Sequence, residues 1–178
     1  MPRLPYLTDT QLGDSEVAAS IRATRRNGRL LNLDRQLLYS PVFARGWGAL
    51  LWPVRTQLDL PVHRRELLMC AVGILNNARY ELHHHGPLFL QAGGTQAQLA
   101  ALEDVPKAAG DAALFDATGR ALLQLAVEMT RNVEVSDATF AAVRAALPDE
   151  RQVVEAIAVV AAYNMVSRFL VALGVEPE

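Results

Sequence analysis

The segment from Asp149 to Gly174 is the feature that most constrains the fold of this chain. It contains the run VVEAIAVVAAY and stops at a glycine, which favours a single long helix from Asp149 to Leu173. A helix that is apolar on nearly every side needs cover from more than one direction. Complete burial within the chain and contact with a second copy are the two solutions, and we expect the second, a homo-oligomer.

Composition extends the helical prediction to the whole chain. Hydrophobic residues make up 51% of the 178 residues and aromatic residues only 6%. Alanine and leucine are abundant and β-branched alternation is nearly absent, which favours helices over strands. We therefore predict one all-α domain over residues 1–178, built from about seven to eight helices.

Capping and helix-breaking residues divide the chain into segments. Asp14 and Ser15 precede a helix that RNG closes, and Thr95 with Gln98 forms a capping box. The other helices are expected at 30–39, 42–58, 62–76, 113–130 and 136–146, before the long one. A further helix, which carries the histidines, is expected to follow NNARY and to end at Gly93 and Gly94. The stretch DVPKAAGD at 104–111 is expected to be a surface linker.

Charge and cysteine content narrow the classes of function. The formal net charge of -2 offers no general attraction to nucleic acid or anionic lipid, and the start of the chain, MPRLPYLTDT, has no apolar signal core. We expect a cytoplasmic protein without nucleic-acid or membrane partners. Cys70 is the only cysteine, which excludes an internal disulfide, a two-cysteine redox centre and a thiolate-rich zinc site.

The stretch YELHHHGPLFLQAGG carries three consecutive histidines on one expected helix. Glu81 and His85 are four residues apart and share a face, whereas Tyr80 and His84 form a second pair rotated by one residue. His83 points elsewhere. One helical turn cannot aim three successive side chains at one point, so we expect His85 to be the working histidine and the other two to be bystanders.

Glu66 lies on the preceding expected helix. If the two helices fold back on one another, Glu66 approaches the face of Glu81 and His85 and makes a cluster of two carboxylates and an imidazole. Like-charge repulsion and burial are expected to raise the pKa of at least one carboxyl, which suits proton transfer near neutral pH. Two alternatives stay open: a solvated surface contact, and a mononuclear metal held by the three side chains.

These residues resemble the carboxymuconolactone decarboxylase and alkylhydroperoxidase-D-like superfamily. Its peroxidase branch places two cysteines between a glutamate and a histidine, at positions that correspond here to Ala78 and Glu81, so neither cysteine is present. The stretch RRELLMCAVGILNNARYELHHHGPLFLQAGGT is similar to the decarboxylase-like branch, with Leu82 in place of the usual tryptophan. The segments NGRLLNLDRQLLYSP and AAYNMVSRFLVALGVEP extend the resemblance over most of the chain.

The resemblance implies an alkylhydroperoxidase-D-like helical domain and a cofactor-independent decarboxylase for a small cyclic carboxylic acid such as 4-carboxymuconolactone. Its catalytic residues would be His85 as proton donor or oxyanion partner, Glu81 as its orienting or relaying group, and Glu66 as the group that tunes their shared charge. We expect neither a cofactor nor a resident metal, and no thiol peroxidase activity. The candidates for binding the substrate are Tyr80, Arg65, Arg79 and Arg168.

Two other functions are compatible with these residues. The fold can persist as a noncatalytic oligomeric module that binds small molecules, or it can catalyse a related proton transfer such as isomerisation or dehydration of a cyclic acid. A fold alone does not decide among them, because function depends on the site. Convergence of Glu66, Glu81 and His85 in a closed pocket would favour catalysis, and exposure to bulk water would favour the binding module.

Overall fold

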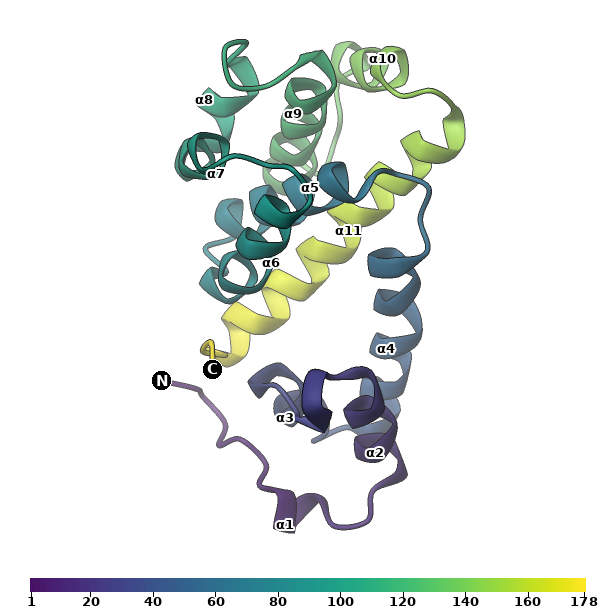
Figure 1. Cartoon of the computed structure of the whole chain (residues 1–178), viewed down its shortest axis with the longest axis vertical. Helices are drawn as coiled ribbons and strands as arrows, with labels where there is room; N and C mark the ends of the chain where they lie inside the picture. Colours follow the sequence, from purple (N-terminus) through teal and green to yellow (C-terminus); the bar gives the residue numbers. More distant parts are fainter.

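The structure, a computed structural model, describes residues 1–178 except for the side chain of Arg26. Within this description the chain is all α-helical and contains no strand, as predicted. Each expected helix is present. In chain order (Figure 1) the elements are α1 Asp9–Leu12, α2 Glu16–Thr24, the 3-10 turn η1 Arg26–Gly28, α3 Asn32–Leu37, α4 Pro41–Thr56, α5 Val62–Leu75, α6 Arg79–Gln91, α7 Gln96–Ala101, the 3-10 turn η2 Leu102–Asp104, α8 Val105–Gly110, α9 Ala117–Arg131, α10 Asp137–Ala146 and α11 Glu150–Leu173.

The helix boundaries follow from capping chemistry. Ser15 accepts a hydrogen bond from the backbone N–H of Ala18 at the start of α2, and Thr95 with Gln98 forms the predicted capping box of α7. Gly174 ends α11 in the left-handed conformation, at φ 62°. A left-handed residue after a helix favours glycine, because glycine has no Cβ to clash there.

The predicted surface linker at 104–111 is wrong. Asp104 accepts a hydrogen bond from the N–H of Lys107, and residues 105–110 form α8. Val105 and Ala108 are buried, and α8 packs against α9. A proline in the first turn favours a helix start as well as a loop, since its missing N–H has no helical partner at that position. Tertiary packing decided between the two.

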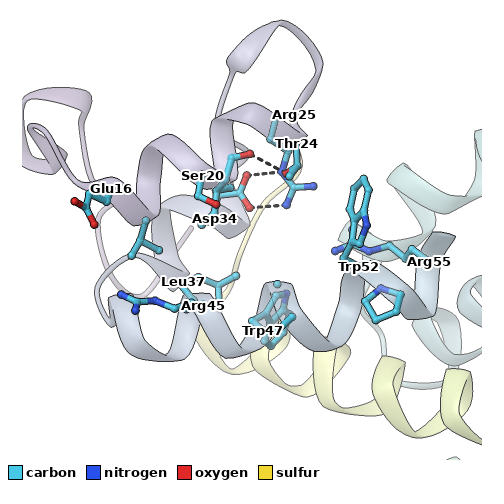
Figure 2. Close-up of a pocket in the computed structure, with 16 residues that line it drawn as sticks. Glu16, Ser20, Thr24, Arg25, Asp34, Leu37, Arg45, Trp47, Trp52 and Arg55 are labelled. Atoms are coloured by element: carbon cyan, nitrogen blue, oxygen red, sulfur yellow. Dashed lines mark hydrogen bonds and ion pairs between the residues drawn. The ribbon is translucent and has the colours of Figure 1, made fainter. Parts of the chain in front are cut away.

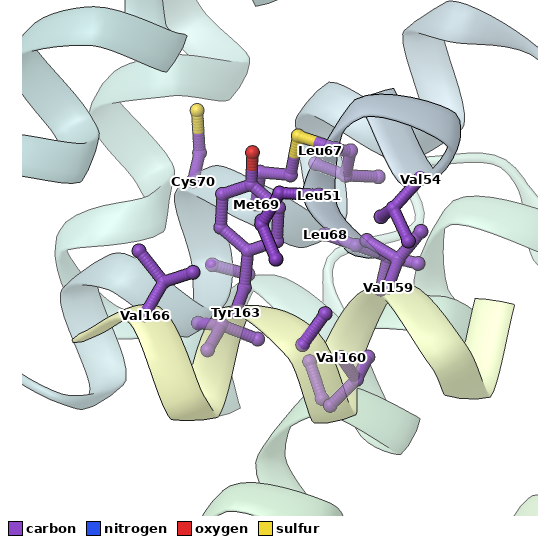
Figure 3. Close-up of a cluster of buried hydrophobic side chains, with 14 of the residues drawn as sticks. Leu51, Val54, Leu67, Leu68, Met69, Cys70, Val159, Val160, Tyr163 and Val166 are labelled. Carbon is purple, nitrogen blue, oxygen red and sulfur yellow. The ribbon is translucent and has the colours of Figure 1, made fainter. Parts of the chain in front are cut away.

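Helix α5 forms the centre of the core. Its residues 65–73 are all buried, and it contacts α6, α9 and α11 (Figure 1). Figure 3 shows Leu67, Leu68 and Met69 of α5 meeting Val159 and other apolar side chains of α11. Any polar side chain on this part of α5 is therefore removed from water, and burying a charge there requires partners.

The N-terminal helices α1–α3, with the first half of α4, lie at one end of the molecule (Figure 1). Helix α4 joins them to the core through an aromatic contact with α11, in which the rings of Trp47 and Phe169 have centroids 5.1 Å apart. The chain termini form a second link, because the N–H of Arg3 donates to the carbonyl of Leu173 at 2.8 Å. This end of the molecule thus rests on fewer contacts than the core does.

Helix α11 is long and apolar enough to cross a bilayer by length and composition alone, but half of its most apolar window is buried inside this fold. That burial fits the core helix of a helical domain. Some of its apolar surface is open, since Val154 is 64% exposed and Val171 46% exposed. The predicted cover by a second copy stays a prediction.

Candidate functional site

A tight turn brings α6 back along α5. Asn77 adopts a left-handed conformation at φ 56°, and the N–H of Ala78 donates to the carbonyl of Gly73 at 2.8 Å. The helices approach so closely at Gly73 that a Cβ added there would lie 2.9 Å from the Cβ of Glu81. Gly73 therefore lets the side chain of Glu81 enter the space between the two helices.

Three elements contribute the polar cluster at this point. Nδ1 of His85 on α6 lies 2.7 Å from Oε2 of Glu66 on α5, and Nε2 lies 3.0 Å from the hydroxyl of Tyr163 on α11. Oε2 of Glu81 is 3.4 Å from the same Nε2. We call Glu66, Glu81, His85 and Tyr163 the proton relay. The predicted convergence of the first three residues is found, and Tyr163 joins them.

The relay is closed to water. Tyr163 is 1% exposed, Glu81 3%, and Glu66 and His85 6% each. A carboxylate can only accept hydrogen bonds, so Nδ1 of His85 donates to Glu66 when that carboxyl is ionised. A neutral imidazole then presents an unprotonated Nε2, to which the hydroxyl of Tyr163 donates. The surrounding protein thus holds one ring nitrogen ready to exchange a proton.

Burial shifts two members of the relay toward their neutral forms. Desolvation raises the pKa of the Glu81 carboxyl, against the opposing charges of His85 and Arg55. Desolvation likewise raises the pKa of the Tyr163 phenol well above its usual value. The prediction that at least one carboxyl pKa is raised is therefore confirmed. The raised pKa favours the protonated form of the Glu81 carboxyl, which can then hold a proton beside the imidazole.

A cavity of about 520 Å³ lies between α2, α3 and α4 (Figure 2). Arg55 lines it from the last turn of α4. A smaller hollow of about 320 Å³ lies beside the turn between α5 and α6 and includes Ala78 and Arg79. Neither cavity is lined by Glu66, Glu81 or His85.

A known protein family matches the part of the chain that carries most of this geometry. The model of the Carboxymuconolactone decarboxylase family matches residues 41–118, which include α4 to α8 and three of the four relay residues. This match supports the resemblance of the chain to the carboxymuconolactone decarboxylase and alkylhydroperoxidase-D-like superfamily. The matched part ends before α11, so Tyr163 lies outside it. No curated protein matches the chain significantly.

Solved structures share the fold of this chain over nearly its whole length. An uncharacterized peroxidase-related protein from Silicibacter sp. TM1040 matches with a TM-score of 0.79 and 21% identity, over 99% of this chain and 94% of that one. Another from Ralstonia eutropha JMP134, an alkylhydroperoxidase AhpD core, gives 0.81 and 19%, over 99% and 92%. A debrominase variant in complex with 2,3,4-tribromopyrrole gives 0.78 and 16%, over 97% and 90%.

The single cysteine of the chain lies in the core, away from solvent. Cys70 follows Glu66 by one helical turn and is fully buried. Burial, together with the nearby charges of Glu66 and Glu81, raises the pKa of its thiol to about 12. The thiolate is the reactive form of cysteine, and it is strongly disfavoured here.

The predicted substrate-binding residues lie apart from the relay contacts. The ring of Tyr80 packs on His84 with centroids 4.4 Å apart, and its hydroxyl donates to Glu178 at 3.3 Å. Arg79 is exposed at the small hollow. Arg168 is exposed and donates to Oδ1 of Asn164 at 2.9 Å. Among the described residues, none of the hydrogen bonds of these side chains reaches His85.

Arg65 is the fourth predicted binding residue and the only buried arginine among them. Its Nε and Nη1 atoms have no hydrogen-bond partner among the described residues. The neighbouring histidines also differ from His85, since His83 is exposed and Nε2 of His84 lies 3.0 Å from Glu178. The structure thus agrees with the prediction that only one of the three histidines joins the acidic pair.

Sequence reasoning missed Tyr163 and Arg55. Tyr163 lies 78 residues after His85, and no helical spacing connects them. The one available signal was a hydroxyl within the apolar run of α11, since a buried tyrosine hydroxyl needs a partner. No sequence pattern singled out Arg55, because the cavity that it lines forms only when α2 and α3 pack beside α4.

The relay does not present the ligands of a metal site. No group of three or more histidine, cysteine or acidic side chains is arranged to hold a metal ion within the described part of the chain. Nδ1 of His85 is occupied by Glu66, and Nε2 by Tyr163. A metal ligand needs a free ring nitrogen, so binding would require these hydrogen bonds to break.

Proposed function

We propose that this protein is a cofactor-independent proton-transfer enzyme that decarboxylates a small cyclic carboxylic acid such as 4-carboxymuconolactone. One observation carries the proposal: the imidazole of His85 is held in the protein interior between Glu66 and Tyr163, with Glu81 beside it. Burial of an imidazole between acidic partners is costly unless they are hydrogen-bonded, and here they are.

The chemistry requires a proton but no external electron acceptor. Cleavage of the carbon–carbon bond to the carboxylate releases carbon dioxide, and the electron pair moves through the ring double bond to the carbonyl oxygen as a dienolate. A proton added at carbon then restores the carbonyl. His85 supplies that proton, and the carboxylate of Glu66 stabilises the imidazolium before transfer.

The other relay residues restore and direct the proton. Glu81, whose pKa is raised by burial, returns a proton to Nε2 of His85 after each turnover. Tyr163 orients the same nitrogen and can donate to a developing oxyanion. Proton uptake from water completes the balance, since loss of carbon dioxide from a carboxylate consumes one proton overall.

Two further observations support this class of reaction. Ala78 and Glu81 stand where the peroxidase branch carries cysteines, and neither can attack a peroxide. A debrominase of the same fold is seen with 2,3,4-tribromopyrrole, a small ring, which supports a ligand of that size. At 16% identity that likeness carries no residue roles to this chain.

A noncatalytic binding module is the second candidate. It is favoured by the cavity between α2, α3 and α4, which has walls suited to a small molecule but is not lined by Glu66, Glu81 or His85. Such a module would bind a ring acid and leave it unchanged. Conversion of the bound acid to product would indicate the enzyme, and binding without conversion would indicate the module.

The deciding experiment follows carbon dioxide release from 4-carboxymuconolactone by the purified protein. We expect release that falls at least about 100-fold in His85→Ala and Glu66→Gln, as for loss of a general acid. His83→Ala is the matched control, because His83 is exposed on the same helix, and it should keep full activity. Absence of release from folded wild-type protein would leave the binding module.

We also propose a homo-oligomer, supported by the exposed valines of α11. Light scattering should give a mass that is a multiple of 19.4 kDa. Val154→Glu and Val171→Glu together should reduce that mass to one chain, because charged side chains are unfavourable in the centre of an interface. A monomeric wild-type protein at micromolar concentration would refute this part of the proposal.

A further inference from the structure

The cavity between α2, α3 and α4 is lined by none of the four relay residues. Its volume of about 520 Å³ falls in the range of small-molecule sites. Both tryptophans of the chain, Trp47 and Trp52, line it. Figure 2 shows Trp52 and Arg55 at the same end of α4, with Arg25 and Asp34 on the N-terminal helices across from them.

The walls of this cavity fit a planar ring. Apolar side chains come from all three helices, namely Val17, Ile21, Leu37, Ala44, Trp47 and Trp52. Trp52 is 49% exposed, so its ring has a face free for stacking. Trp47 is buried, and its Nε1 has no hydrogen-bond partner among the described residues. An unpaired indole N–H at the wall favours a ligand with an acceptor atom.

The charged side chains that line the cavity do not cancel one another. Arg25 is neutralised by Asp34 through two hydrogen bonds of 2.8 and 2.6 Å. Glu16, Arg45 and Arg55 remain, which leaves one net positive charge on the lining. Arg55 donates only to the carbonyl of Leu51, at 3.4 Å, within the described chain. Its guanidinium is therefore available to a carboxylate, for which two parallel hydrogen bonds are the favoured geometry.

We propose that this cavity binds a small ring carboxylate, with the ring between Trp47 and Trp52 and the carboxylate on Arg55. The proposed binding of a ring carboxylate names the substrate site of the proposed function. It rests on that function only for the claim that the bound ligand is decarboxylated. It also replaces Arg65, Arg79 and Arg168 as the residues that hold the substrate.

Arg55 also connects the cavity to the relay. Its positive charge lowers the pKa of both Glu81 and Tyr163, against the larger effect of burial, so it lies within electrostatic reach of both. Leu51 and Val54, on the same turn of α4, lie by Tyr163 and Val159 in Figure 3. A carboxylate on Arg55 would neutralise this charge and favour the protonated forms of Glu81 and Tyr163, as a proton donor requires.

The two tryptophans allow a direct test with benzoate, which cannot follow the decarboxylation path of the lactone. We expect benzoate to quench the tryptophan fluorescence of the wild-type protein with saturation, and benzyl alcohol, which lacks the charge, to bind more than about tenfold more weakly. Arg55→Gln should weaken benzoate binding by about tenfold or more. Arg144→Gln is the control, because Arg144 pairs with Glu150 at the surface and does not line the cavity.

The outcomes separate this inference from the proposed function. His85→Ala should bind benzoate as the wild type does, because His85 does not line the cavity. Saturable binding by a wild-type protein that releases no carbon dioxide would support the cavity and refute only the decarboxylase. Equal binding of benzoate and benzyl alcohol, or unchanged binding in Arg55→Gln, would refute the role of Arg55. Absence of saturable quenching would refute the site. Tryptophan emission that shifts to the red on dilution of the protein would show that a second copy covers the cavity, which also refutes it.

Discussion

The proton relay and the cavity on α4 differ in almost every physical property. The relay is built from α5, α6 and α11, the central helices, and its four side chains are at most 6% exposed. The cavity is built from α2, α3 and α4 at one end of the molecule, with an exposed tryptophan and unneutralised arginines. The relay gathers buried acid–base groups, whereas the cavity offers space for a ligand beside Arg55.

This difference reflects the opposite requirements of the two tasks. Tuning a carboxyl pKa by burial requires that water be excluded, which the densely packed centre provides. Admitting a ligand requires a surface that opens, and the end of the molecule with fewer contacts provides it. Arg55 is where the two regions meet, because it lines the cavity and its charge acts on the relay.

The substitution Tyr163→Phe should have the largest effect that is confined to the relay. It removes the hydroxyl 3.0 Å from Nε2 of His85 and leaves the ring in place. We expect the rate of carbon dioxide release to fall by about 100-fold, in the range of lost acid–base assistance. Benzoate binding in the cavity should be unchanged. The rate is measured by trapping the released carbon dioxide.

Tyr39→Phe is the control for that change, because Tyr39 is 46% exposed and its hydroxyl donates only to the carbonyl of Pro5. Equal loss of activity in both variants would show that the relay hydroxyl has no special role. A Tyr163→Phe protein that loses benzoate binding would show that the two regions are not separable.

The substitution Gly73→Ala should disturb the relay by packing alone. The added Cβ would lie 2.9 Å from the Cβ of Glu81, so α6 must shift. We expect a loss of about 1–3 kcal/mol in the free energy of unfolding, as for an overpacked core. Gly86→Ala on α6 is the control, since its Cβ would meet Leu99 at an ordinary 3.5 Å. There we expect a gain of about 0.5–1 kcal/mol from helix propensity.

Chemical denaturation of both variants measures these changes. If Gly73→Ala is as stable as Gly86→Ala and equally active, the close approach of α5 and α6 does not position Glu81.

The smallest expected effect is on the pH dependence of stability. The pKa of Glu81 is raised in the folded protein, so the folded state holds more protons than the unfolded state above the usual value of 4.5. The free energy of unfolding of the wild type should therefore fall as pH rises from there through the raised pKa. Glu81→Gln removes this contribution, so the variant should gain stability relative to the wild type over that window.

The pH dependence of stability that comes from Glu128 should have the opposite sign, so Glu128 serves as the comparison. Hydrogen bonds from Gln124, Thr139 and Ser136 lower its pKa to about 2. Its contribution is present above 4.5 and is lost as pH falls toward that lower value. Glu128→Gln should thus be less stable than the wild type at neutral pH, and the gap should close in acid. Urea unfolding across the pH range tests both signs, and parallel profiles for the two variants would contradict the assigned shifts.

Local patterns were enough to predict much of the site. Helical spacing placed Glu81 and His85 on one face, and the turn between the expected helices suggested that Glu66 would approach them. The contacts of 2.7 and 3.4 Å agree with both inferences. The error at α8 arose because its proline and glycine suit a loop as well as a short helix, and only burial of Val105 and Ala108 distinguishes the two.

By itself, the sequence determined the all-α class, the capped helix boundaries and that His85, of the three histidines, shares a helix face with Glu81. These three features depend on the spacing of residues along a single helix or within one turn. Such local spacing can be recognised from residues that are close in sequence. Only the tertiary structure decided that Tyr163 completes the relay, that Arg55 joins it to a cavity, and that Tyr80 faces Glu178 instead. Contacts between residues some 80 to 100 positions apart depend on how helices pack, and helix packing depends on the shape of the whole core.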